Sequence, residues 1–219
     1  MTRIQTAIGG ALVLVALFAW SARPTAAVPT LPDPVVDDAP GKGSASVVLA
    51  GGCFWGIEEV FQHVRGVTDA VSGYSGGSKR DAEYEVVSSG TTGHAESVKV
   101  TYDTAQVTLG TLLKVFFSVA HDPTQLNRQG PDTGPQYRSA IFFSGERQQQ
   151  VAKAYVEQLT ADKVYRGKIV TQIVPLTAFY PAEDYHQDFA KKNPNHRYIL
   201  AWDKPKVEDL HRTFAQLYK

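Results

Sequence analysis

The amino-acid sequence predicts an α+β protein, a two-layer α/β sandwich with one mixed sheet and long loops. Short apolar or alternating runs such as 47–50 and 96–102 are typical of strands, whereas 109–120 and 146–159 repeat apolar residues at helical spacing. These two kinds of segment alternate along the chain, which is the pattern of a layered domain. The stretch 124–136 is rich in Gly, Pro, Asn and Asp and is expected to form a long polar loop.

Each expected strand or helix is bounded by glycine, proline or polar residues. Strands are expected where apolar residues run together or alternate, and helices where they recur three or four residues apart. Residues 84–87 fit either a helical turn or a loop. The expected elements are a strand at 47–50, a helix at 54–64, strands at 67–74 and 96–102, a helix at 109–120, a strand at 137–143, a helix at 146–159, a strand at 169–174, and helices at 181–192 and 207–218.

The N-terminal part has the composition of a targeting segment followed by a linker. Residues 1–27 combine an early Arg3, an uncharged and mostly apolar stretch, and small residues up to Ala27. This pattern predicts a secretory signal peptide cleaved after Ala27, with an uncleaved membrane anchor as the alternative. Residues 28–46 are rich in Pro, Ala, Gly, Asp and Ser and are expected to be a flexible linker. The sequence therefore predicts an exported protein, periplasmic or secreted, with one domain at 47–219.

The composition is that of a globular protein without a strongly charged surface. Of 219 residues, 43% are hydrophobic and 20% are charged, and the formal net charge at pH 7 is +0. Such a chain is not expected to bind nucleic acid. The single cysteine excludes an internal disulfide and a cysteine-rich zinc site, and His94, His121 and His186 lack the spacing of a metal motif. No pattern indicates an assembly, so we expect a monomer.

The glycine-rich stretch 51–56 carries this one cysteine between a predicted strand and a predicted helix. The glycines indicate a tight turn, which would put Cys53 at or near the helix N-terminus. The helix dipole there favours an anion, so we expect a lowered pKa and a nucleophilic thiolate. Phe54 and Trp55 would form an apolar wall beside the sulfur. The alternatives are a buried structural cysteine and ordinary packing of the two aromatic rings.

Four further side chains are candidates for a site around Cys53. Glu96 follows a glycine-containing loop at a strand start, and an apolar pocket would raise its pKa so that it holds a proton near neutral pH. A solvated surface acid is the alternative. Tyr84 and Tyr137 could donate hydrogen bonds, or they could be ordinary boundary aromatics. Asp132 lies in the long polar loop, where turn formation alone would explain it.

Motifs spread along 47–197 together resemble the class A peptide methionine sulfoxide reductases. Any one motif is unspecific, but their number and order are specific to that family. The resemblance implies a ferredoxin-like core for the predicted sandwich. The motifs are Gly52-Cys53-Phe54-Trp55-Gly56, Gly73-Tyr74-Ser75-Gly76-Gly77, Tyr84, Gly93-His94-Ala95-Glu96, His121-Asp122-Pro123-Thr124, Asn127-Arg128-Gln129-Gly130, Asp132, and Gln136-Tyr137-Arg138-Ser139.

This resemblance implies a reaction and a role for each candidate residue. Cys53 would attack the sulfur of the S epimer of methionine sulfoxide, free or in proteins, and Glu96 would donate a proton to the oxygen. Methionine would leave, and Cys53 would become a sulfenic acid. No metal, flavin or nucleotide is implied. The implied substrate-binding residues are Tyr84 and Tyr137 for the oxygen, Phe54 and Trp55 for the methyl group, and Asp132 for the shape of the pocket.

The chain departs from many members of that family in its cysteines. Residues 193–219 contain none, and Ser88 stands where another cysteine is common. An external thiol would therefore reduce the sulfenic acid directly, supplied by a thioredoxin, a glutaredoxin or a small thiol. Two other functions use the same cysteine. A thiol peroxidase would turn over peroxide, and a redox sensor would bind oxidised methionine without turnover.

Overall fold

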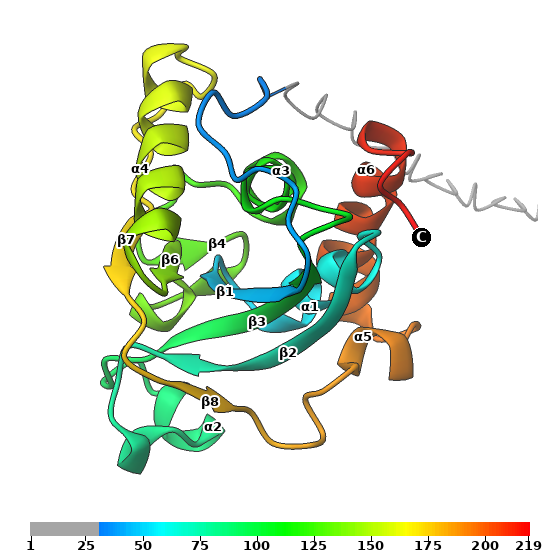
Figure 1. Ribbon diagram of the computed structural model, residues 1–219. Helices are drawn as coiled ribbons and strands as arrows, with labels where there is room; N and C mark the ends of the chain where they lie inside the picture. Colours follow the sequence, from blue (N-terminus) through cyan, green and yellow to red (C-terminus); the bar gives the residue numbers. More distant parts are fainter. Residues whose placement is uncertain (1–30) are drawn as a thin grey trace, which may run out of the picture.

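The computed structural model describes residues 31–219 and contains one six-stranded sheet with the order β7-β6-β1-β3-β2-β8 (Figure 1). Strands β6 and β7 pair in parallel, and the other neighbours pair antiparallel, so the sheet is mixed as predicted. The strands are β1 (Ser44–Ala50), β2 (Val67–Ser75), β3 (Ala95–Asp103), β6 (Ala140–Phe143), β7 (Gln172–Pro175) and β8 (Phe179–Pro181).

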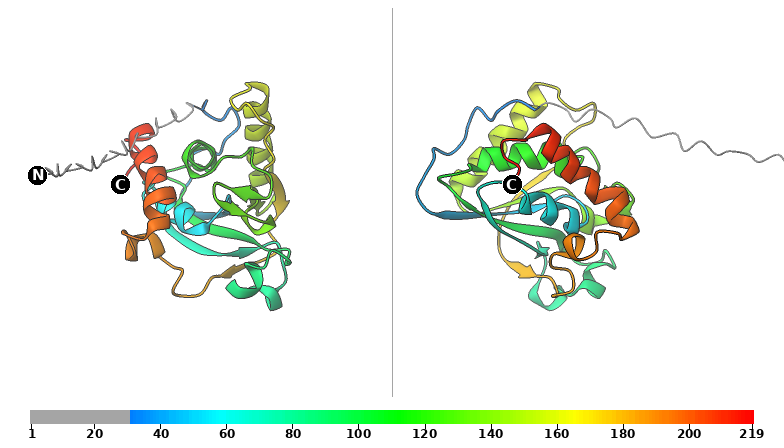
Figure 2. Two further views of the ribbon diagram at one scale, coloured as in Figure 1. Left: turned by 180° about the vertical axis from the view of Figure 1, so that it is seen from behind. Right: turned by 90° about the vertical axis from the view of Figure 1, so that its right-hand side faces the viewer.

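The longer helices lie together on one face of this sheet (Figure 2). They are α1 (Phe54–Gln62), α3 (Leu109–Val115), α4 (Glu146–Ala161) and α6 (Lys204–Thr213). The chain order β1-α1-β2-β3-α3-β6 with the spatial order β6-β1-β3-β2 is a ferredoxin-like core. The predicted two-layer α+β class is therefore confirmed.

The core follows from the alternation of side chains along the strands. In β1, Val47 and Leu49 belong to the main cluster under the helices, whereas Val48 and Ala50 belong to a smaller cluster on the other face. Phe179 packs against that second cluster. Residues 47–50 of β1 form a continuous apolar run because both faces of the strand are covered there, and this buried end is held where the glycine-rich turn begins.

Most predicted elements are found within a few residues of the expected bounds, but the helix expected at 181–192 is wrong. Only α5 (Phe189–Lys192) is helical there. Asp188 has a left-handed backbone with φ of 57°, and its N–H donates to the carboxylate of Glu58 on α1. A distant buried acceptor thus decides the local conformation and overrides the helical pattern.

Three other segments differ in detail from their predictions. Residues 84–87, which the pattern left undecided, form α2 (Tyr84–Val87). The helix expected at 109–120 ends in a π-helical turn (Phe116–Ala120). The long polar loop contains a short hairpin of β4 (Arg128–Gln129) and β5 (Asp132–Thr133). This hairpin gives Asp132 a defined place in the fold.

Residues 31–43 form an ordered strap instead of the flexible linker expected at 28–46, and β1 begins at Ser44. Leu31 is 2% exposed, Tyr155 on α4 donates to the Pro32 carbonyl, and the Gly110 N–H donates to Asp37 at 2.7 Å. These contacts explain why residues 31–43 pack against the domain although their composition is that of a flexible linker. The predicted signal peptide and its cleavage position lie outside the described residues.

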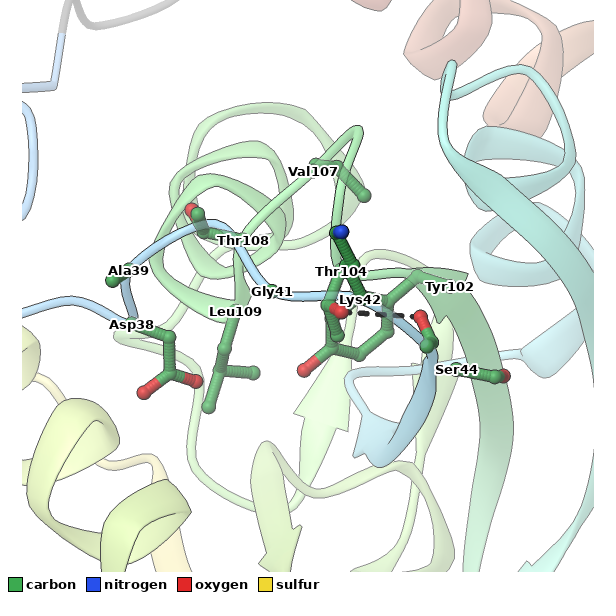
Figure 3. Close-up of a pocket in the computed structure, with 11 residues that line it drawn as sticks. Asp38, Ala39, Gly41, Lys42, Ser44, Tyr102, Thr104, Val107, Thr108 and Leu109 are labelled. Carbon is green, nitrogen blue, oxygen red and sulfur yellow. Dashed lines mark hydrogen bonds between the residues drawn. The ribbon is translucent and has the colours of Figure 1, made fainter.

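A cavity of about 400 Å³ opens beneath the strap, beside Lys42, Tyr102 and Leu109 (Figure 3). The Thr104 hydroxyl donates to the Gly43 carbonyl at its rim. None of the site residues predicted from the sequence lines this cavity. Among residues 31–219, no helix combines the length and apolar character needed to cross a bilayer.

Candidate active site

Cys53 lies at the junction of β1 and α1, as predicted, in the N-cap position of the helix. Gly52 has φ of 104°, which L side chains rarely adopt, and a Cβ on Gly51 would lie 2.8 Å from the ring of His121. The turn therefore requires both glycines. It leaves the Cys53 residue 8% exposed. The thiol is buried at the end of a helix, beside the sheet.

The predicted lowering of the Cys53 pKa is wrong for this site. Burial raises the pKa of the Cys53 thiol well above its ordinary value, and the carboxyl groups of Glu96 and Asp203 raise it further. The Trp55 N–H and the Lys206 ammonium lower the pKa but do not outweigh burial. The resting form of the cysteine is therefore a neutral thiol.

Glu96 is a buried acid, not the surface carboxylate that remained an alternative. It lies in β3 opposite Tyr74 of β2, and the residue is 2% exposed. Its Oε2 accepts the N–H of Phe54, the residue after Cys53, at 3.1 Å. Burial raises the pKa of Glu96 to about 8, and this hydrogen bond opposes the rise. Glu96 thus holds a proton at neutral pH next to the cysteine, as the sequence predicts.

Tyr84 and Tyr137 come from different helical turns and act on the same two groups, Glu96 and Cys53. Tyr84 begins α2, and Tyr137 ends a short 3₁₀ turn (Pro135–Tyr137) after the β4–β5 hairpin; both are half-buried. Burial raises the pKa of each phenol, and the nearby charges of Glu96 and Cys53 raise it further. Both phenols therefore stay protonated and can donate hydrogen bonds.

Trp55 and Phe54 form an aromatic cluster with residues from the C-terminal third of the chain. The indole of Trp55 stacks on Phe189 with ring centroids 3.8 Å apart, and its Nε1 donates to Nδ1 of His186 at 3.1 Å. The Phe54 ring lies 5.0 Å from the His186 ring and is itself 1% exposed. Trp55 is half-buried, so its ring is the more accessible wall.

Asp132 is held beside these rings by Tyr198. The Tyr198 hydroxyl donates to Asp132 Oδ2, and its ring meets Trp55 edge-on with centroids 6.0 Å apart. Burial raises the pKa of Asp132, whereas this hydrogen bond lowers it. All seven residues predicted for the site therefore converge on one region. Turn formation alone does not account for Asp132.

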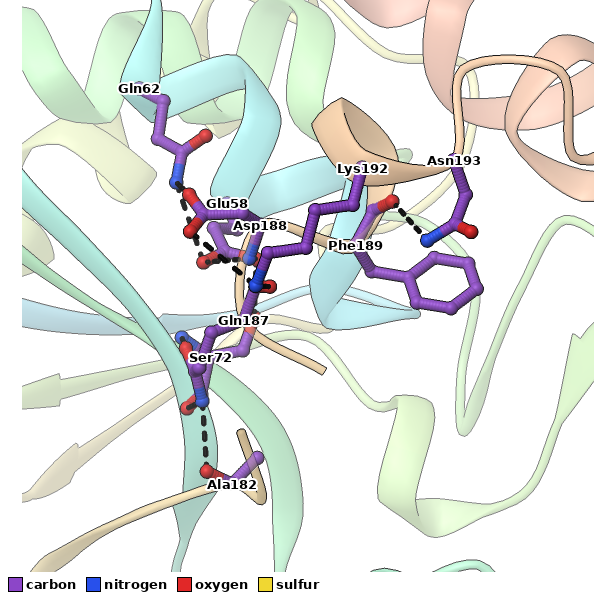
Figure 4. Close-up of polar contacts among 9 residues, drawn as sticks. All are labelled: Glu58, Gln62, Ser72, Ala182, Gln187, Asp188, Phe189, Lys192 and Asn193. Atoms are coloured by element: carbon purple, nitrogen blue, oxygen red, sulfur yellow. Dashed lines mark hydrogen bonds and ion pairs between the residues drawn. The ribbon is translucent and has the colours of Figure 1, made fainter. Parts of the chain in front are cut away.

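Glu58 fixes the C-terminal segment 182–193 that carries the partners of Trp55 (Figure 4). Its carboxylate accepts the Ser72 hydroxyl at 3.0 Å and the Asp188 N–H at 3.1 Å. Gln187 Nε2 donates to the Ala182 carbonyl at 2.9 Å. Burial raises the pKa of Glu58 to about 7. This network fixes the segment that carries His186 and Phe189, and thereby positions these two partners of Trp55.

Sequence reasoning missed His186 and Tyr198 as parts of the site. The spacing of the histidines favours a structural or hydrogen-bonding role for His186 over metal binding, and its hydrogen bond with Trp55 is such a role, but no motif placed it in the site. Tyr198 lies in the tail where the family resemblance ends. Among the described residues, no group of three His, Cys, Asp or Glu side chains could hold a metal ion. The site can instead combine a thiol, a protonated carboxyl and three phenols.

Comparisons with known proteins identify the family of the chain. The family model of peptide methionine sulfoxide reductase matches residues 45–218. A peptide methionine sulfoxide reductase of Mesorhizobium japonicum is 56% identical over 183 residues, covering 84% of this chain and 94% of that protein. One from Synechocystis is 52% identical over 193 residues, covering 86% and 90%.

Solved structures give the same result for the fold. Methionine sulfoxide reductase A of Corynebacterium diphtheriae is 36% identical with a TM-score of 0.61, covering 80% of this chain and 92% of that one. Reduced Mxr1 of Saccharomyces cerevisiae is 34% identical with a TM-score of 0.63, covering 74% and 92%. The chain therefore belongs to the peptide methionine sulfoxide reductase family and is a methionine sulfoxide reductase.

Proposed function

We propose that the chain reduces the S epimer of methionine sulfoxide, free or in proteins, with Cys53 as nucleophile and Glu96 as proton donor. The observation that carries this proposal is the hydrogen bond from the Phe54 N–H to Glu96 Oε2. It holds a protonated carboxyl beside the residue that bears the thiol. Tyr84 and Tyr137 then supply neutral donors for the sulfoxide oxygen, and Trp55 supplies an apolar wall for the methyl group.

The proposed step transfers the oxygen and two electrons. The sulfoxide oxygen takes the proton that Glu96 holds, the Cys53 sulfur attacks the sulfoxide sulfur, and the proton of the Cys53 thiol passes to the Glu96 carboxylate left by the first transfer. In the resulting adduct the hydroxyl group passes to the Cys53 sulfur: a sulfur–oxygen bond to Cys53 forms, while the sulfur–oxygen bond of the substrate and the new sulfur–sulfur bond break. Methionine leaves as the thioether, and Cys53 becomes a sulfenic acid. Substrate sulfur is reduced, cysteine sulfur is oxidised, and Glu96 ends protonated as it began.

The test follows the loss of separate S and R epimers of a blocked methionine sulfoxide with excess dithiothreitol. Wild type should consume the S epimer alone, Cys53→Ser should be inactive, and Glu96→Gln should be slowed roughly 100-fold or more. Consumption of neither epimer, with Cys53 still reactive toward peroxide, would reject the proposal in favour of a thiol peroxidase.

An external thiol is proposed to complete the cycle, because Cys53 is the only cysteine of the chain. Two thiols would convert the sulfenic acid to the thiol and water, and they would leave as a disulfide. A thioredoxin, a glutaredoxin or a small thiol fits this chemistry. Comparing turnover at equal thiol concentration would rank them, and equal slow rates with all three would argue against a dedicated protein reductant.

The protein is proposed to be exported, either periplasmic or secreted, with residues 1–27 removed. The proposal rests on the charge and apolar pattern of that segment. Mass spectrometry of the protein isolated from its native host would show an N-terminus at Val28. An intact N-terminus in the membrane fraction would instead identify an uncleaved anchor.

A further inference from the structure

An ion pair from the C-terminal helix lies against the first turn of α1. Helix α6 packs on α1 (Figure 2). Lys206 Nζ donates to Asp203 Oδ1 at 3.1 Å. A Cβ on Gly56 would lie 2.1 Å from Asp203 Oδ1 and 2.8 Å from Lys206 Nζ. The pair thus occupies the space left by the glycine three residues after Cys53. Its charges are brought to the helix end that carries the thiol.

Burial of the Asp203–Lys206 ion pair is expected to add little to the free energy of unfolding. Asp203 is 0% exposed, and the Lys206 side chain is 18% exposed. Within residues 31–219, the second carboxylate oxygen of Asp203 has no hydrogen-bond partner. Removing two charges from water costs free energy that one short contact rarely offsets. The placement therefore calls for another reason.

The groups that face Cys53 are otherwise acidic or neutral. Glu96 on β3 and Asp203 before α6 raise the pKa of Cys53, whereas Lys206 lowers it. The Lys206 charge also lowers the pKa of Asp132 and Glu59, so it acts on neighbouring acids as well as on the thiol. The phenols that share a charge interaction with Cys53 are Tyr84, Tyr137 and Tyr198.

We propose that Lys206 is a positioning residue that acts through Cys53. Its ammonium, held over Gly56 by Asp203, stabilises the anionic forms of the Cys53 sulfur, the thiolate before attack and the sulfenate after it. Asp203 both anchors the ammonium and limits its effect. The catalytic consequence rests on the proposed function, whereas the effect on thiol ionisation does not.

The test measures the ionisation of Cys53 without substrate, in the full-length protein. Because Cys53 is the only cysteine, the rate of iodoacetamide alkylation against pH reports it alone. At about pH 8, Lys206→Met should react roughly tenfold more slowly than wild type, and Asp203→Asn roughly tenfold faster. Lys206→Arg should match wild type, and the double variant Asp203→Asn with Lys206→Met should return toward it.

The opposite signs separate an electrostatic role from a structural one. A structural defect would change the plateau rate through access to the sulfur, whereas a changed charge moves the midpoint of the pH profile. Near-ultraviolet circular dichroism checks that each variant is folded, and the isosteric Asp203→Asn keeps the test valid where Lys206→Met fails to fold. Midpoints that move in the same direction, or not at all, overturn the proposal.

Turnover then separates this inference from the proposed function. With dithiothreitol, Lys206→Met should lose S-epimer reduction at about pH 7 and recover part of it at higher pH, because more thiolate forms there. Shifted alkylation midpoints without turnover in any protein, wild type included, would reject the proposed function and leave the charge effect standing. Turnover of the S epimer with alkylation midpoints that do not shift in the variants would support the proposed function and overturn the proposed role of Lys206.

Discussion

Replacing Glu96 by Gln is expected to make the protein more stable at alkaline pH while making it a poorer catalyst. The native site forces the carboxyl to keep its proton, because the residue is 2% exposed and its pKa rises from 4.5 to about 8. In the unfolded chain the carboxyl ionises at its ordinary pKa. The amide of Glu96→Gln has no charge to bury, and its carbonyl can still accept the Phe54 N–H.

The size of the effect follows from linkage. A carboxyl with a raised native pKa contributes stability that is complete below its unfolded pKa and is lost as pH rises toward the native one. The loss is about 1.4 kcal/mol for each pH unit between the two values. From about pH 5 to pH 8.5, the free energy of unfolding of wild type should fall by on the order of 4 kcal/mol relative to Glu96→Gln.

Urea unfolding at these two pH values measures the difference directly. Both proteins should carry Cys53→Ser, so that oxidation of the thiol does not interfere. All other groups titrate in both proteins and cancel in the comparison. Glu85→Gln is the matched control, because it removes an exposed carboxyl on α2 that keeps its contact with water.

One result would refute this reasoning. If the stability difference between wild type and Glu96→Gln is the same at both pH values within about 1 kcal/mol, Glu96 titrates in the native protein as it does in the unfolded one. It would then be ionised at neutral pH and could not donate a proton there. A stability difference that grows with pH, together with slowed turnover, is the expected outcome.

Three further substitutions test the supports of the site. Asp37→Ala removes the acceptor of the Gly110 N–H and should lower the free energy of unfolding by about 1 kcal/mol in urea; an unchanged value would mean that the strap adds nothing. Leu112→Ala, at 0% exposure, should cost about 2–5 kcal/mol in the same assay, and a cost below 1 would show a loosely packed core. His186→Leu removes the acceptor of Trp55 Nε1 and should raise KM for methionine sulfoxide roughly 2- to 10-fold, with recovery in His186→Asn.

The sheet and the long helices could be predicted because each depends on a local periodicity. In β3, Val98, Val100 and Tyr102 alternate with more polar residues and are all buried. The segment 181–192 could not be predicted in this way. Its conformation depends on Glu58, more than a hundred residues earlier, and no local pattern reports such a contact.

The sequence predicted which residues form the site more successfully than it predicted the pKa of Cys53. The seven residues, which come from five separate motifs, do converge, because the motifs identify side chains that must meet. The helix dipole alone predicted an acidic thiol at Cys53, yet the depth of burial and the position of Asp203 have the opposite effect. Neither quantity can be read from residues 51–56. Tyr198 was missed for the same reason, since its contact with Asp132 joins segments 66 residues apart in the sequence.

The C-terminal tail of this chain is anchored to the rest of the fold, and this anchoring bears on how an oxidised Cys53 would be reduced. The Arg65 N–H donates to the Leu217 carbonyl, and the Lys219 N–H donates to the His63 carbonyl at 3.0 Å. Leu210 on α6 is 0% exposed. A segment with these anchors cannot swing over Cys53 without losing core contacts, and residues 193–219 carry no thiol to deliver. Under the proposed function, the thiol that reduces an oxidised Cys53 is therefore expected to come from another molecule.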